Sequence, residues 1–131
     1  MAAAVLRSME ARFGEILQPL VSEPDVAEGV AEMARRMAVV YRDGRMACVL
    51  DTMTLIGAPQ DIRAHATRLA RTWLDAMADA AARAGSSEQE AQSRARAALV
   101  RIEGALVVAR VLDDPSVFEQ VLGELPDLLA R

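Results

Sequence analysis

Residues 97–112 read AALVRIEGALVVARVL, a stretch free of proline and long enough for about four helical turns. At about 100° per residue, Arg96, Glu103 and Arg110 recur every seven residues and form one narrow polar edge. Arg101 lies roughly 160° from Glu103 on the same helical wheel. The other side chains are Ala, Leu, Val, Ile or Gly. Because a helix that is apolar nearly all round needs cover on more than one side, we expect its own core to cover one side and a second subunit the other.

The overall composition predicts one globular domain over residues 1–131. Hydrophobic residues make up 53% of the chain and charged residues 26%, which is ordinary for a folded domain. Aromatic residues reach only 3%, so aliphatic side chains and seven methionines must fill the core. The net charge of −4, with no basic run longer than Arg35-Arg36, argues against direct binding to nucleic acid.

Cysteine usage and apolar runs exclude several classes of protein. The single cysteine, Cys48, excludes an internal disulfide and a cysteine-based zinc site, and it favours the reducing cytoplasm. The N-terminal MAAAVLRSMEARF carries charges and lacks a signal-peptide pattern. No run of about eighteen apolar residues occurs, so no membrane span is expected.

Glycine and proline divide the chain into six segments, each with apolar side chains at helical spacing, so we predict an all-α fold of six helices. Pro19 should kink or end the first helix, since proline lacks the N–H. Ser87 and Glu90 form a capping box for the fifth, and Asp114-Pro115 starts the last. The expected helices span about 2–18, 24–43, 46–56, 59–84, 87–112 and 115–129. The third, MACVLDTMTLI, is nearly all apolar and is expected in the middle of the fold.

This order of helices, with CVLDTMTLIG at 48–57 and RIEGALVVARVLDDPSVFEQVLGELPDLL at 101–129, resembles the C-terminal domain of TetR/AcrR-family transcriptional regulators. The resemblance covers essentially the whole chain. Its most specific part is an Arg-x-Glu-Gly-Ala-Leu helix, a short Asp-Pro turn and a leucine-rich last helix. It implies a homodimer held by a four-helix interface, to which each subunit contributes its last two helices.

The resemblance also implies a pocket for a small hydrophobic effector, walled by the first four helices and the inner face of the fifth. In that family an N-terminal helix-turn-helix head reads the operator. No segment of this chain resembles such a head, so we expect either a truncated or a natural stand-alone form that does not bind an operator by itself.

Candidate residues follow from these two expected surfaces. Core packing is the alternative role for the apolar and aromatic residues of the ligand-binding set, which is given next. The expected ligand-binding residues are Phe13, Leu17, Met33, Met37, Tyr41, Asp51, Thr52, Leu55, Trp73, Met77 and Arg101. The expected dimer-interface residues are Gly104, Val107, Val108, Val111, Phe118, Val121, Leu122 and Leu125.

Asp51 is the least usual residue of the third segment. A carboxylate in a buried helix is costly unless it is paired or hydrogen-bonded. Asp51 is therefore expected either to contact a polar group of the ligand or to pair with Arg101. Cys48 is expected to be a small buried hydrophobe, and the lone His65 to lie at the surface or at the rim of the pocket.

The sequence contains no pattern typical of a catalytic site. It has no Gly-x-Ser-x-Gly, no glycine-rich phosphate loop and no paired-histidine motif, so no enzyme, metal or cofactor is expected. We predict the effector-binding and dimerisation domain of a TetR-like repressor. The alternative is a stand-alone helical module that heterodimerises with a full-length regulator.

Overall fold

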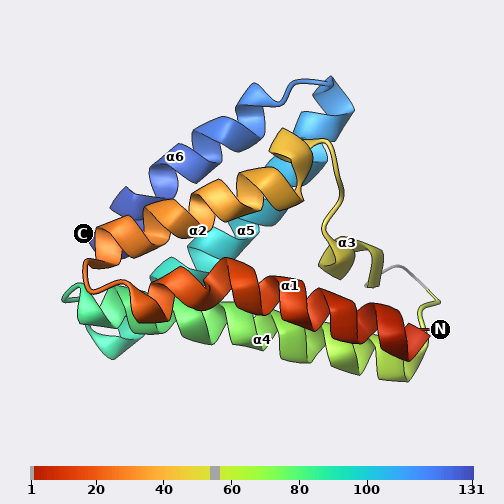
Figure 1. Cartoon of the computed structure of the whole chain (residues 1–131), viewed down its shortest axis with the longest axis horizontal. Coiled ribbons are helices and arrows are strands. Elements are labelled where there is room, and N and C mark those ends of the chain that lie inside the picture. Colours follow the sequence, from red (N-terminus) through yellow and green to blue (C-terminus); the bar gives the residue numbers. More distant parts are fainter. Residues whose placement is uncertain (1, 54–56) are drawn as a thin grey trace.

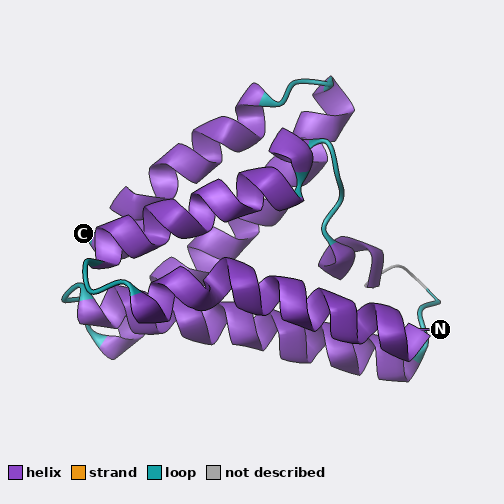
Figure 2. Cartoon of the chain, in the orientation of Figure 1, coloured by secondary structure: helices purple, strands orange, loops and turns teal. Residues whose placement is uncertain are grey.

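The structure is a computed structural model that describes residues 2–53 and 57–131, and the regular structure of these residues is helical throughout (Figures 1 and 2). This confirms the all-α prediction. A 3₁₀ turn, η1 (Arg42–Gly44), and the short helix α3 (Val49–Met53) connect α2 to α4. The five long helices are α1 (Ala2–Ser22), α2 (Val26–Val40), α4 (Gln60–Arg83), α5 (Glu88–Leu112) and α6 (Ser116–Ala130).

The long helices pack in sequence around a shared core. Helices α1 and α4 lie side by side and run in the same direction, and α2 lies between α1 and α6 (Figure 1). Helices α5 and α6 form an antiparallel hairpin. Helices α4 and α5 are joined by a short turn and diverge from it, and α3 lies toward the open end between them (Figure 1).

One continuous hydrophobic cluster receives side chains from every helix. Phe13 and Trp73 meet edge to face, with ring centroids 5.3 Å apart, and join α1 to α4. Tyr41 and Phe118 do the same at 6.1 Å, and join the end of α2 to α6. Burial of this aliphatic and aromatic surface is the main source of stability, because each fully buried side chain contributes about 1.5–3 kcal/mol.

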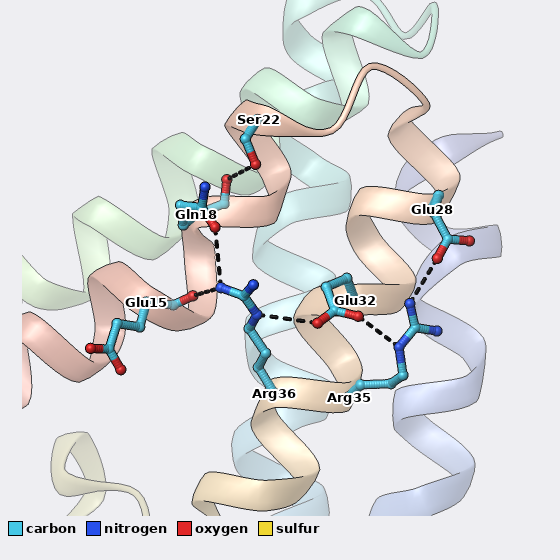
Figure 3. Close-up of polar contacts among 7 residues, drawn as sticks. All are labelled: Glu15, Gln18, Ser22, Glu28, Glu32, Arg35 and Arg36. Carbon is cyan, nitrogen blue, oxygen red and sulfur yellow. Dashed lines mark hydrogen bonds and ion pairs between the residues drawn. The ribbon is translucent and has the colours of Figure 1, made fainter.

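Helix α1 continues through Pro19 for one further turn, where the sequence predicted a kink or an end. Proline has no N–H, so the carbonyl oxygen of Glu15 loses its usual donor four residues later. Arg36 of α2 replaces that donor: one guanidinium nitrogen lies 2.6 Å from the Glu15 carbonyl oxygen and 3.2 Å from Oε1 of Gln18 (Figure 3). A side chain far away in the sequence thus satisfies the carbonyl that Pro19 leaves without its helical donor.

Replacing Arg36 with alanine is expected to lower the free energy of unfolding by about 1–2 kcal/mol, because the Glu15 carbonyl loses a charge-assisted hydrogen bond. Urea unfolding followed by circular dichroism would measure the change. Arg35→Ala is the matched control, since Arg35 bonds only Glu28 and Glu32 on its own helix (Figure 3). Equal losses in the two variants would contradict this role for Arg36.

The third predicted helix begins later in the chain than expected, and its described part is more peripheral. Left-handed φ angles at Arg42, Asp43 and Gly44 turn the chain, and α3 begins only at Val49. One side of the segment faces the core through Cys48, Leu50 and Met53. Met46 is 41% exposed, and the side chain of Asp51 is 47% exposed. The prediction of a helix is confirmed for Val49–Met53, but its start at residue 46 and its central position are wrong for the residues that the structure describes.

Candidate functional site

A cleft lies where α3 meets the diverging helices α4 and α5. It consists of two cavities that share Leu50 of α3. The first, of about 660 Å³, follows one side of α4 and is lined by Gln60, Arg63, Ala64, Ala66, Thr67, Ala70, Arg71 and Leu74. The second, of about 510 Å³, follows α5 and is lined by Asp51, Leu99, Val100, Glu103, Gly104 and Val107. Each volume falls within the range of about 300–1,000 Å³ that small-molecule sites occupy.

The two walls of the cleft carry opposite charge over an apolar base. Arg63 and Arg71 lie on the α4 side, while Asp51 and Glu103 lie on the α5 side. Asp51 already forms an ion pair, with its Oδ2 3.6 Å from a guanidinium nitrogen of Arg110. Both partners are partly exposed, so we expect this ion pair to contribute little to the stability of the fold. Its main effect is to orient α3 against α5.

Three side chains lie close together behind the α5 wall: Tyr41, Cys48 and Glu103. The hydroxyl oxygen of Tyr41 lies 3.4 Å from Sγ of Cys48, and either atom can be the donor. Burial raises the pKa of Tyr41, and burial together with the Glu103 charge raises the pKa of Cys48 to about 12. Cys48 is therefore a buried neutral thiol, as predicted.

The pKa of Glu103 is raised above its ordinary value of 4.5, first by burial and then by the nearby charge of Asp51. The folded state thus holds this proton more tightly than the unfolded chain does. Stability is complete below the ordinary pKa and falls as the pH rises through the raised one. We expect Glu103→Gln to melt at a higher temperature than the original protein at about pH 7, with a difference that shrinks toward about pH 4.

Thermal melts across that pH range would test this expectation. Glu124→Gln, at an exposed carboxyl of α6, is the control and should show a difference that does not depend on pH in this way. A Glu103→Gln protein that is less stable at neutral than at acid pH, relative to the original, would contradict the argument.

Most of the predicted ligand-binding residues lie in the packed core. They line neither cavity of the cleft, and their exposed fractions are 5% or less: Phe13, Leu17, Met33, Met37, Tyr41, Trp73 and Met77. In this structure these residues pack in the core, which is the alternative role considered for them. Leu55 and the side chain of Thr52 lie outside the described residues.

Asp51 lines the cleft but is not buried, and its ion-pair partner is Arg110 rather than Arg101. Arg101 is exposed and lies about 160° from Glu103 around α5, which turns it away from Asp51. The predicted Asp51–Arg101 pair is therefore wrong. The seven-residue spacing of Glu103 and Arg110 was the sequence signal for the correct partner, because it places both side chains on one edge of α5.

The predicted interface residues divide into two groups. Phe118, Leu122 and Leu125 are 0%, 7% and 0% exposed, because they pack into the core of their own subunit. Their assignment to an interface is therefore corrected. Val121 is half-buried on α6. The four on α5 are exposed: Gly104, Val107, Val108 and Val111.

His65 is half-buried between α4 and α1. Arg68 donates to its Nδ1 at 2.9 Å, so in the neutral ring Nε2 carries the hydrogen, 3.0 Å from Oε1 of Glu10. Within the described part of the chain, no group of three histidine, cysteine or acidic side chains is arranged to hold a metal ion. In the same residues, no helix has both the length and the apolar character needed to cross a bilayer.

Comparison with known protein families shows which family the chain belongs to. The family model described as "Transcriptional regulator LmrA/YxaF-like, C-terminal domain" matches residues 26–124. The chain belongs to this family. The match confirms the predicted resemblance to the C-terminal domain of TetR regulators. No curated protein and no solved structure matches the chain significantly. In this LmrA/YxaF-like domain, the matched residues begin at the first residue of α2 and include both walls of the cleft.

Proposed function

We propose that residues 1–131 form one effector-binding and dimerisation domain of a TetR-like transcriptional repressor that acts in the cytoplasm. The effector is a small hydrophobic molecule that enters along the α4 side of the cleft, because Val100, Gly104 and Val107 on the α5 side belong to the face proposed below for the dimer. The domain works by binding, without catalysis or a cofactor, and does not itself contact DNA. Its membership of the LmrA/YxaF-like family supports the regulatory role. The net charge of −4 supports the lack of DNA contact.

The observation that carries the dimer is the outward face of α5. This face is opposite the core-facing residues of the same helix, such as Ala98, Ile102 and Ala109. Contiguous exposed apolar side chains of this kind mark interaction sites. Their exposed fractions are Val100 71%, Val107 39%, Val108 43%, Val111 78% and Leu112 62%.

Two further features favour a helix as the partner of this face. Gly104 lies at its centre, and within the described part of the chain no other atom would come within 4 Å of a Cβ placed there, so another helix could approach closely. Val117 and Val121 of α6 are only half-buried and extend the apolar surface along the hairpin. A two-fold axis beside α5 would cover both hairpins at once and produce a four-helix interface.

The contacts between α1 and α4 can transmit a displacement from the cleft to the N-terminal helix. Glu10 meets His65 near the start of α4, and Arg83 at its end donates to the carbonyl oxygen of Leu20. Arg63 and Arg71 of the same α4 line the cleft. A ligand that displaces α4 would therefore displace α1, the helix that would join a DNA-binding head in the family.

Sedimentation equilibrium at micromolar concentration tests the proposal and should show a dimer. A thermal-shift screen against hydrophobic compounds should find molecules that raise the melting temperature, since a ligand bound at about 100 times its Kd adds about 2.7 kcal/mol. A monomer, or no stabilisation by any such compound, would contradict the proposal. Tight binding of this chain to duplex DNA at moderate salt would also contradict it.

A further inference from the structure

We infer that the effector is an uncharged, mainly apolar molecule with a hydrogen-bond acceptor, and that the Nε1–H of Trp73 donates to this acceptor. The inference rests on the proposed function, because it names the chemistry of the molecule that the domain captures. A buried donor without a partner, and the adaptable side chains around it, carry the argument.

The indole of Trp73 is 2% exposed, and its Nε1 has no hydrogen-bond partner among the described residues. A buried tryptophan N–H ordinarily finds an acceptor, and leaving it without one is unfavourable. Phe13, which meets the indole edge to face, offers only carbon atoms. A ligand acceptor at this position would therefore supply a hydrogen bond that the protein alone does not make.

The core around Trp73 can change shape to admit a ligand. Met33, Met37 and Met77 are fully buried in the same cluster, and Met77 follows Trp73 by one helical turn. Methionine is unbranched and has three rotatable bonds, so it adapts to irregular shapes at low cost. A ligand could therefore make room in part by rotating these side chains.

The cleft gives a route to this part of the core. Ala66 and Ala70 line its α4 wall, and Trp73 follows them by seven and three residues. All three therefore adjoin on one side of α4. Trp73 itself does not line the 660 Å³ cavity, and the two alanines beside it on α4 are small. We expect a ligand in the cavity to reach Nε1 past Ala70.

The buried core around Trp73 favours an uncharged effector. Among the described residues, no charged side chain is fully buried, so the core has no counter-charge for an ion. On the opposite wall Asp51 already pairs with Arg110, and burial of Glu103 disfavours its charged form. An apolar molecule with a carbonyl or ether oxygen fits both facts.

Benzophenone and diphenylmethane form a matched pair of probes, because they share two phenyl rings and differ in one carbonyl group. Calorimetric titration should show that benzophenone binds about tenfold more tightly than diphenylmethane. Trp73 is the only tryptophan, so its indole gives a single N–H resonance. This resonance should move downfield with benzophenone and not with diphenylmethane. Trp73→Phe keeps an aromatic ring, and the preference should fall to about twofold or less.

Equal affinity for the two probes, an indole resonance that benzophenone leaves unchanged, or binding of neither probe would overturn the inference. The resonance is measured on the unaltered protein, so the test does not depend on how the variant folds. Tetraphenylphosphonium is the charged probe. Tighter binding of this cation than of benzophenone, weakened by Glu103→Gln, would also overturn the inference. Equal binding of the two neutral probes would leave effector capture intact, so this failure is distinct from failure of the proposed function.

Discussion

Replacing Val111 with arginine is expected to convert the dimer into a monomer. Val111 is 78% exposed within the subunit, so the change leaves the core of that subunit intact. In the proposed interface the guanidinium would be buried without a partner, and a two-fold dimer would bury it twice. We expect the dissociation constant to rise by at least about 100-fold. Sedimentation equilibrium over a concentration series would measure it.

Val39→Arg is the matched control for this variant. Val39 is 79% exposed and is the penultimate residue of α2, as Val111 is of α5. Both substitutions place a cation at a helix C-terminus, where it is favourable. The control should remain a dimer. Val100→Arg, at an exposed position on the same face of α5, should dissociate as Val111→Arg does. Dissociation of the Val39 variant, or a Val111 variant that stays dimeric, would contradict the interface.

For α5 and α6 the sequence indicated which sides are apolar, but not what covers them. On α5 the lack of a broad polar face indicated a second apolar side, and Val100, Val108 and Val111 are exposed; that a partner covers them stays a prediction. On α6 the apolar residues were assigned to the interface, but Phe118 and Leu125 face the subunit's own core. Helical periodicity shows which side of a helix is apolar. It does not show which neighbour covers that side.

The candidate site was harder to predict because it depends on contacts between distant residues. The apolar composition around Asp51 indicated a buried carboxylate, yet α3 lies at the edge of the fold and Asp51 meets Arg110. Likewise, Pro19 indicated a helix end, and only the approach of Arg36 explains why α1 continues. The unpaired N–H of Trp73 cannot be predicted from the sequence, because it results from the lack of an acceptor among the described core residues around the indole.

Gly44→Ala is expected to be the most destabilising small substitution in the turn between α2 and α3. Gly44 has φ +89°, in the left-handed region, and its N–H donates to the Tyr41 carbonyl oxygen at 3.0 Å. A Cβ there would lie 2.8 Å from Cβ of Phe118 and 3.3 Å from Cβ of Ala109. The alanine therefore adds backbone strain of about 1–2 kcal/mol and overpacking of about 1–3 kcal/mol. We expect a total loss of about 2–5 kcal/mol, measured by urea unfolding.

Gly85→Ala separates the two causes of this loss. Gly85 also has a left-handed φ, +113°, but no atom would lie within 4 Å of its added Cβ. It should therefore lose only the backbone part, about 1–2 kcal/mol. The difference between the variants measures how closely the turn approaches α5 and α6. Similar losses in both would mean that Phe118 moves aside freely. That result would contradict the tight packing of η1 against Phe118, the residue that the sequence assigned to the dimer interface and the structure places in the core.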